Sequence, residues 1–461
     1  MPVRKKPFAA LLVAASLTLG VPAVGAKENP SPPPQAQKAF DNKIIKRIKA
    51  DNMYNHIAHL SSEPRIAGTE AEWNAVQYIE GELASYGYET EIQPFTFQNY
   101  YSPNVSVTAG NETLTSSGFT YAPNGTVTAD LVYAGLGTPS DLEGLNLTGK
   151  VALIQRGEIS FAEKVLNAAD AGASAVIIFN NTSGPINGTL GEPNDNFVPA
   201  VAISQEDGER LAASLERGEA ITANVSVTGG GIVEETSHNV VAVKEPTHKK
   251  KAADQIIIVG SHHDSVSGSP GANDDASGVA ATLELARVLA NMPTDTEIRF
   301  VTFGAEELGL IGSYEYVDTM SEDERSRVIG MFQMDMVGSR DAGELVMFTV
   351  DGQKNTVTDL AAAAGVRTGT PLTYGQEGRS DHVPFHYAGI PAALFIHNPL
   401  EPWYHTPEDS LDKISKEKLQ ESAEIVGAAV YQAARPDTPA LDRSKVAPVP
   451  VDYEKMVGGL Q

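Results

Sequence analysis

From residue 239 to residue 434, short apolar segments alternate with amphipathic ones, and this alternation restricts the fold more than any other feature. Apolar runs predict buried strands, and apolar residues three and four apart predict helices. We expect strands at 239–243, 255–261, 297–304, 330–336, 344–350 and 392–397, and helices at 277–289, 309–319, 356–364 and 416–434. Strands that alternate with helices pair in parallel and are covered on both faces. The sequence therefore predicts an α/β fold with a mostly parallel, doubly wound central sheet.

A second, smaller unit is expected between residues 129 and 233. Two apolar runs, 151–154 and 175–179, read as buried strands on either side of a helical stretch at 161–171. The run Gly229-Gly230-Gly231 is typical of a hinge at the exit of such a unit. We therefore divide the chain into the first part of a main domain (40–128), an inserted α/β domain (129–233), the second part of the main domain (234–435) and a proline-rich tail (436–461).

The first residues have the pattern of an export signal. Arg4, Lys5 and Lys6 precede an apolar run that is shorter than the ~20 residues of a membrane span. Small residues then offer a cleavage site, so we expect a signal peptide at 1–26 and a spacer at 27–39. The alternative is an uncleaved membrane anchor. The expected location is outside the cell, without a membrane anchor once the signal is removed.

Composition excludes several classes of function. Lys and Arg total 34 against 59 Asp and Glu, a net charge of −25 that nucleic-acid phosphates would repel. The chain has no cysteine, so disulfides, thiolate nucleophiles and cysteine-bound metals are excluded, and any metal must be held by His, Asp and Glu. An exported protein without cysteine suits a cell whose secreted proteins do not depend on disulfides, such as a Gram-positive bacterium.

Five short stretches place His, Asp or Glu where predicted strands end or helices begin. Each has an ordinary explanation: a turn with a helix N-cap, solvated glutamates or a structural histidine. An acid within an apolar strand, as expected for Asp335, needs a cation or donor partner. Taken together, the five candidate ligands suit zinc. They are His262, Asp274, Glu307, Asp335 and His405.

Five ligands are too many for one catalytic zinc, which normally keeps three and an open position. Two ions that share Asp274 fit better, with His262 and Asp335 on one ion and Glu307 and His405 on the other. Glu306 would then be free as a proton carrier. Asp264 can hydrogen-bond the ring nitrogen of His262 that faces away from the metal.

These stretches resemble the co-catalytic di-zinc aminopeptidase family, which has the zinc exopeptidase fold and whose relatives include glutamate carboxypeptidase and the transferrin receptor. The motifs stand in the family's order: His262-x-Asp264, Asn273-Asp274-Asp275, Gly304-Ala305-Glu306-Glu307-Leu308-Gly309, Met334-Asp335-Met336 and Tyr404-His405-Thr406. The resemblance implies two Zn²⁺ ions on the five ligands above and Glu306 as general base. It further implies that Tyr404 helps to hold the oxyanion and that Arg379, in Gly378-Arg379-Ser380-Asp381-His382, contacts substrate.

The insert at 129–233 is similar to the protease-associated domain. The matching positions are the run 149–157, Phe161, Lys164 and 169–173. This likeness implies a non-catalytic lid or recognition module.

The hypothesis is a secreted, monomeric zinc aminopeptidase that hydrolyses the first peptide bond of peptides with a free N-terminus. Three alternatives stay open: a carboxypeptidase or dipeptidase on the same fold, a one-zinc glutaminyl cyclase, and a receptor-like binding ectodomain without catalysis. The pair His262 and Asp335 disfavours the cyclase. No Gly-x-Ser-x-Gly turn and no His-Glu-x-x-His helix occurs, which disfavours serine and single-zinc hydrolysis.

Overall fold

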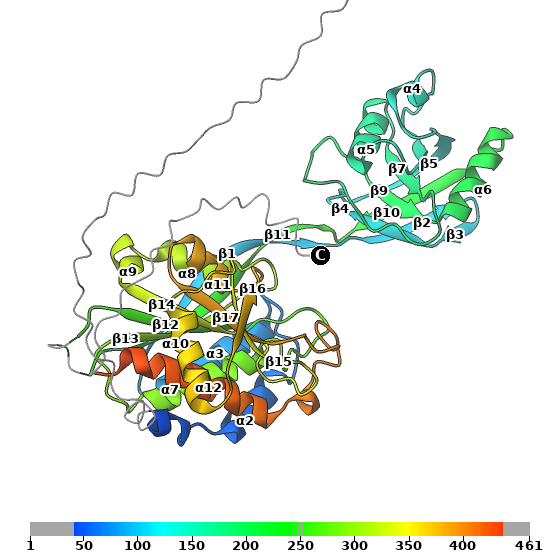
Figure 1. The fold of residues 1–461 in the computed structure, drawn as a ribbon. Helices are drawn as coiled ribbons and strands as arrows, with labels where there is room; N and C mark the ends of the chain where they lie inside the picture. The colour runs from blue at the N-terminus through cyan, green and yellow to red at the C-terminus, as the bar shows by residue number, and fades with distance from the viewer. Residues whose placement is uncertain (1–40, 248, 250–251, 437–461) are drawn as a thin grey trace, which may run out of the picture.

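The computed structural model describes residues 41–247, 249 and 252–436 (Figure 1). The expected signal peptide, the spacer and residues 437–461 of the tail lie outside these residues. Among the helices of the described ranges, none has the length and apolar character needed to cross a bilayer.

The main domain is built on an eight-stranded sheet. In spatial order its strands are β1 (Glu89–Tyr101), β11 (Gly231–Lys244), β13 (Glu297–Phe303), β12 (Ile256–His262), β14 (Val328–Met334), β17 (Ala392–Asn398), β15 (Glu344–Thr349) and β16 (Thr373–Gln376). The four pairings β13–β12, β12–β14, β14–β17 and β15–β16 are parallel, whereas β1–β11, β11–β13 and β15–β17 are antiparallel. The predicted parallel α/β sheet is confirmed at its centre, and antiparallel strands flank it.

Helices cover both faces of this sheet, as predicted. Side chains of a strand alternate between faces, and in β12 the residues Ile257 and Val259 join the larger core while Ile256 and Ile258 join a smaller one on the opposite face. The larger core lies under α2 (Ala50–Leu60), α3 (Glu70–Ser85), α7 (Ala276–Leu289), α10 (Thr356–Thr368) and α12 (Lys416–Ala434). The opposite face carries α8 (Ile311–Thr319), α9 (Glu322–Arg327) and α11 (His382–Tyr387) (Figure 1).

The loops that follow the central parallel strands meet at one edge of the sheet. This edge is where open α/β sheets place their sites. One expectation was wrong in detail: Asp335 does not lie inside a strand. The strand β14 ends at Met334, because Met336 adopts a left-handed conformation with φ of 56° that an extended strand cannot contain. Asp335 is therefore free to face the edge.

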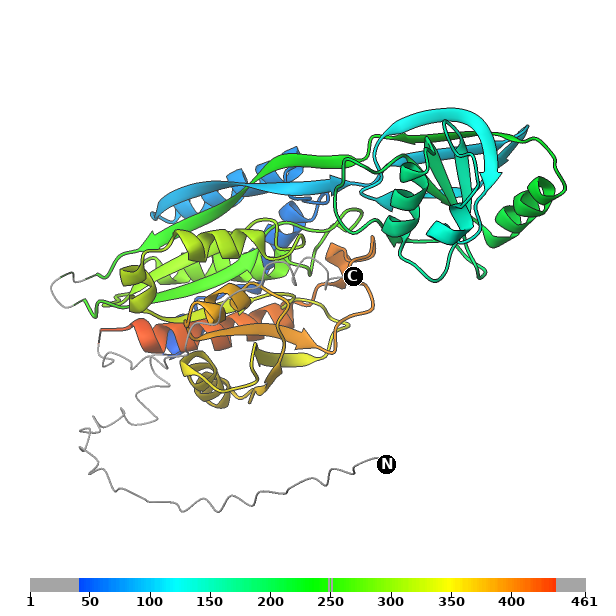
Figure 2. The same cartoon turned by 90° about the horizontal axis from the view of Figure 1, so that it is seen from above.

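A second sheet with its own apolar core stands at the far end of the paired strands β1 and β11, which form a long two-stranded ribbon (Figure 1, Figure 2). Its helices are α4 (Pro139–Leu142), α5 (Phe161–Asp170) and α6 (Gln205–Glu216). Its strands, in spatial order, are β3 (Glu112–Leu114), β2 (Asn104–Ala109), β10 (Thr222–Thr228), β5 (Gly125–Tyr133), β6 (Val151–Gln155), β7 (Ala175–Phe179), β9 (Ala200–Ile203), β4 (Ser116–Thr120) and β8 (Gly188–Thr189).

Strands β2, β3 and β4 precede residue 129, at which the sequence predicts the insert to begin. They join the second sheet because β2 pairs with β10 and β4 pairs with β9, both from far along the chain. The predicted domain boundaries themselves stay a prediction.

Gly278 permits the close contact between α7 and the end of β14. A Cβ there would lie 2.2 Å from the carbonyl oxygen of Met334, whereas one at Gly81, in α3, would meet nothing within 4 Å. We expect Gly278→Ala to lower the free energy of unfolding by about 1–3 kcal/mol. The matched change Gly81→Ala should raise it by about 0.5–1 kcal/mol. Urea unfolding, followed by the fluorescence of Trp73 and Trp403, measures the free energy of unfolding of both variants. Equal unfolding midpoints for the two variants would contradict this account of the packing.

Candidate metal centre

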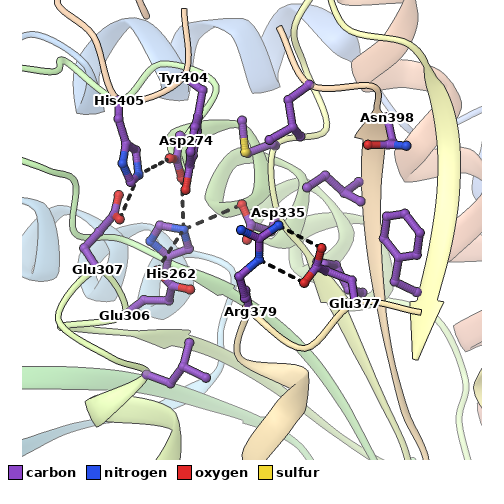
Figure 3. Close-up of a pocket in the computed structure, with 16 residues that line it drawn as sticks. His262, Asp274, Glu306, Glu307, Asp335, Glu377, Arg379, Asn398, Tyr404 and His405 are labelled. Carbon is purple, nitrogen blue, oxygen red and sulfur yellow. Dashed lines mark hydrogen bonds and ion pairs between the residues drawn. The ribbon is translucent and has the colours of Figure 1, made fainter. Parts of the chain in front are cut away.

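A pocket of about 330 Å³ lies at the edge where the central strands end (Figure 3). All five predicted ligands line it, together with Glu306, Tyr404 and Arg379. These residues come from separate segments between His262 and His405. The structure thus brings together the catalytic, ligand and substrate-contact residues that the sequence predicts.

Asp274 stands at the centre of the cluster, and its two carboxylate oxygens face different imidazoles. Oδ1 lies 3.2 Å from Nε2 of His262, and Oδ2 lies 3.2 Å from Nε2 of His405 (Figure 3). The Oε2 atom of Glu307 is 3.0 Å from the same nitrogen of His405. On the other side, Oδ1 of Asp335 is 3.6 Å from Nε2 of His262. Asp274 therefore lies between the imidazole of His262 on one side and that of His405 on the other.

Several buried polar atoms of this cluster have no hydrogen-bond partner among the described residues. They include Oδ1 of Asp335 and Oε1 of Glu307. Leaving a buried carboxylate oxygen unpaired is unfavourable, and a bound cation removes that penalty. Imidazole nitrogens and carboxylate oxygens are ligands that zinc accepts. The residues present therefore fit zinc.

Glu306 faces the same space as Asp335. Its Oε2 atom is 4.0 Å from Nε2 of His262, and His262, Glu306 and Asp335 each offer an atom close enough to the others to hold one ion. A second group that could hold an ion consists of His262, Asp274 and Glu307.

Two neighbouring aspartates fix the loops around the ligands. The carboxylate of Asp264 accepts the backbone N–H groups of Glu306 (3.1 Å) and Glu307 (3.2 Å). Its distance of 3.5 Å to Nδ1 of His262 is long for the hydrogen bond that the sequence predicts. Asp264 therefore acts chiefly on the two glutamates.

Asp275 caps the N-terminus of α7 by accepting the N–H of Gly278 at 2.8 Å. The same carboxylate accepts the N–H of His262 (3.2 Å) and of Met336 (3.0 Å). The side chain of Asp275 thus links the ends of β12 and β14 to the start of α7 by hydrogen bonds.

Crowding of acids shifts the ionisation of the site. Burial raises the pKa of Glu306 well above its usual range, and repulsion from Glu307 adds to the effect although His262 opposes it. Burial also raises the pKa of Glu307, to about 7. Burial opposes charge on His405, but hydrogen bonds with Asp274 and Glu307 outweigh it and raise its pKa to about 10. Likewise, bonds with His262 and His405 hold the pKa of Asp274 below its usual value against the effect of burial.

Tyr404 and Arg379 occupy different sides of the pocket. The Tyr404 ring stacks on His405, with ring centroids 3.8 Å apart. Arg379 makes two hydrogen bonds of 3.0 Å to the carboxylate of Glu377, on the opposite side of the pocket from His405 (Figure 3). The sequence did not single out Glu377, although it lies two residues before the predicted Arg379.

Other residues of the site escaped the sequence analysis. Ser380 donates a hydrogen bond of 2.8 Å to Oδ2 of Asp335, and Asp409 accepts backbone bonds beside Asp274. Ser380 stands inside the motif of residues 378–382 and Asp409 stands three residues beyond the motif of residues 404–406, but neither motif indicates these contacts. An apolar wall was missed entirely, because its members come from separate loops and strands: Leu310, Met336, Phe348, Leu394, Ile396 and Leu400.

Comparison with known proteins agrees with this geometry. Residues 239–430 match Peptidase family M28, and residues 127–211 match the PA domain. Aminopeptidase YwaD of Bacillus subtilis (strain 168) is 42% identical over 402 residues, which cover 84% of this chain and 86% of the relative. The chain belongs to peptidase family M28. The predicted resemblance to zinc aminopeptidases with an inserted protease-associated domain is thereby confirmed.

Solved structures of this family have the same architecture. An aminopeptidase from Aneurinibacillus sp. strain AM-1 is 60% identical, with a TM-score of 0.68 and coverage of 90% of this chain and 99% of the other. BSAP, a zinc aminopeptidase from Bacillus subtilis, is 39% identical, with a TM-score of 0.63 and coverage of 85% and 97%.

Zinc binding to the metal-stripped protein should release protons at pH 7. The imidazole of His405, with its pKa of about 10, and a share of the Glu307 carboxyl, with its pKa of about 7, carry protons that zinc must displace. We therefore expect the apparent zinc affinity to rise as the pH rises from about 6 to about 9. Calorimetric titration in buffers of different ionisation enthalpy counts the protons. His405→Ala should release fewer, and binding heats that do not depend on the buffer would contradict the prediction.

Proposed function

We propose that this M28 peptidase is a secreted aminopeptidase that removes the first residue of peptides with two zinc ions. The arrangement of Asp274 carries the proposal, because a carboxylate whose two oxygens face His262 and His405 separately is suited to bridging two ions. His262 and Asp335 would complete one position, and Glu307 and His405 the other. The relatives named above, which are aminopeptidases, support the reaction.

Bound zinc would polarise the scissile carbonyl and acidify a water molecule. Glu306 would take the proton of the attacking water and pass it to the leaving amine. Its raised pKa suits this exchange, because a carboxylate that binds a proton more readily is a stronger base for the attacking water. Tyr404, stacked on His405, would direct its hydroxyl to the oxyanion that forms on the former carbonyl.

The charges of the pocket favour a free amine over a free carboxylate as the group recognised. The carboxylates of Asp274, Glu306, Glu307 and Asp335 would offset the charge of two Zn²⁺ ions, which leaves no excess of positive charge to hold a terminal carboxylate of the substrate. A carboxypeptidase needs a cation for the substrate's terminal carboxylate. Arg379 is the one Lys or Arg among the lining residues described, and Glu377 already holds it through two hydrogen bonds. The dipeptidase and carboxypeptidase readings are therefore less well supported.

The remaining proposals concern the wider protein. An apolar wall that includes Met336, Phe348 and Leu394 favours an apolar first residue in the substrate. The predicted export signal supports a location outside a Gram-positive cell, and we propose a monomer. All five ligands and the base are present, which argues against a receptor-like ectodomain and against a one-zinc cyclase.

Chromogenic anilides provide the test of the aminopeptidase proposal. We expect leucine p-nitroanilide to be hydrolysed faster than the aspartate anilide, and N-acetyl-leucine p-nitroanilide to be left intact. A leucyl dipeptide amide should still be cleaved, since its blocked carboxyl is not needed. A chelator should abolish hydrolysis and added zinc should restore it, with two zinc ions per chain by elemental analysis. Cleavage of the acetylated substrate, or full activity without metal, would overturn the proposal.

Removal of the Glu306 carboxylate separates its role from metal binding. We expect Glu306→Ala to lower kcat by about 10²-fold or more, because proton transfer is lost. Zinc content should stay at the wild-type value, since the five ligands are unchanged. Glu408→Gln, in the loop that carries His405, changes an exposed carboxylate and should leave kcat unaltered. Loss of zinc from Glu306→Ala would instead make Glu306 a ligand.

A further inference from the structure

Asp409 lies four residues after His405 and is 1% exposed. Its carboxylate accepts two backbone N–H groups of another loop, that of Asn273 on Oδ1 at 2.8 Å and that of Asp274 on Oδ2 at 3.1 Å. The backbone carbonyl of Asp409 accepts the N–H of Ala272 at 3.3 Å. Three consecutive N–H groups of the Asp274 loop thus end on one residue of the His405 loop.

The His405 loop is compact up to this point. The N–H of Thr406 bonds to the carbonyl of Trp403 (3.0 Å), and the N–H of Asp409 bonds to that of Thr406 (3.1 Å). These two turns make Trp403 to Asp409 one local unit. A fixed Asp409 therefore also fixes the backbone from which the imidazole of His405 projects.

His405 needs such support more than the other ligands do. His262 is the last residue of the central strand β12, Asp335 follows β14 directly, and the N–H of Glu307 is held by Asp264. His405 stands on a loop, with φ of 58° and a side chain that is 35% exposed. Its Nε2 atom must nevertheless meet Oδ2 of Asp274 and Oε2 of Glu307 at 3.2 and 3.0 Å.

A carboxylate at position 409 is unfavourable on its own. It is buried beside the carboxylate of Asp274, and burial together with that repulsion raises its pKa to about 6 although the backbone bonds oppose the shift. An uncharged side chain would pack there at a lower cost of desolvation. The carboxylate nevertheless has two acceptor oxygens, and these can bind two successive backbone N–H groups at the same time.

We propose that Asp409 is a positioning residue that sets the zinc affinity of one position of the pair, the one served by Glu307 and His405. It does so by holding the backbone of Asp274 against the loop of His405, so that both side chains reach the same ion. The position of His262 and Asp335 depends on it less, because His262 ends the strand β12, Asp335 follows β14 directly, and only Asp274 is common to both positions. This inference rests on the proposed two-zinc function.

A second contact joins the same two loops and provides the matched control. Glu401 accepts a hydrogen bond of 2.7 Å from the side-chain amide of Asn273 and is also buried. This bond involves the side chain of Asn273 and makes no contact with the backbone of Asp274. Glu401→Gln retains an acceptor oxygen and removes a buried charge, so it tests whether any change between these loops weakens zinc binding.

The experiment titrates zinc into metal-stripped wild type, Asp409→Ala, Asp409→Asn and Glu401→Gln, in competition with a chelator of known affinity. We expect two tightly bound ions in wild type and Glu401→Gln. In Asp409→Ala one ion should stay tight and the other weaken by about 10- to 100-fold. Asp409→Asn, whose amide oxygen can keep one N–H bond, should fall between. Excess zinc should restore the hydrolysis that either variant loses.

Three results would overturn the inference. Equal weakening of both ions in the Asp409 variants would mean a general structural role, and unchanged affinities would mean no role in binding. Wild type that binds fewer than two ions would instead remove the proposed function, so the two failures are distinguishable. Thermal unfolding of each metal-stripped variant identifies any that fails to fold. If Asp409→Ala fails, the zinc affinities of Asp409→Asn, which keeps the shape of the side chain, test the inference.

Discussion

The mutual repulsion of buried carboxylates at one edge of the sheet is the constraint on which the rest of the structure depends. Asp274, Glu306, Glu307 and Asp335 line one pocket, and His262 and His405 are the imidazoles among them. Such a cluster is stable only if cations, hydrogen-bond donors or protons offset its charge. The raised pKa values of Glu306 and Glu307 show that the protein's own donors do not offset it fully. Protons or divalent cations are the remaining means, and the unpaired oxygens of Asp335 and Glu307 suit a cation.

Hydrogen bonds between carboxylates and backbone N–H groups hold this cluster in place. Asp264, Asp275 and Asp409 each accept backbone N–H groups from loops that carry ligands, so that no ligand depends on its own loop alone. Hydrogen bonds between a charged acceptor and N–H groups are stronger than neutral ones. Further carboxylates thus stabilise a site that is already acidic. This arrangement is possible because the parallel strands β12, β13 and β14 end side by side and their loops lie within reach of one another.

The sequence predicts what depends on local pattern and on residue type. Segments rich in apolar residues identify β12, β13 and β14, and the absence of cysteine leaves His, Asp and Glu as the metal ligands. Pairing between distant segments could not be predicted. The antiparallel match of β1 with β11, and the union of β2 and β4 with strands beyond residue 199, depend on registers that no local pattern encodes. For the same reason the motifs located Ser380 and Arg379 but did not show their contacts with Asp335 and Glu377, and nothing indicated the contact of Asp409 with Asp274.

Fold and site also differ in what stabilises them. The sheet is held by two apolar cores on its faces, neither of which includes a ligand of the metal centre. The loops at its edge are held by hydrogen bonds to carboxylates, whose strength depends on the charge that surrounds them. A change in metal content therefore acts on the edge loops, and on His405 above all, since its side chain is the most exposed of the five ligands. Metal affinity and catalytic competence can thus vary through the loops while the sheet keeps its stability.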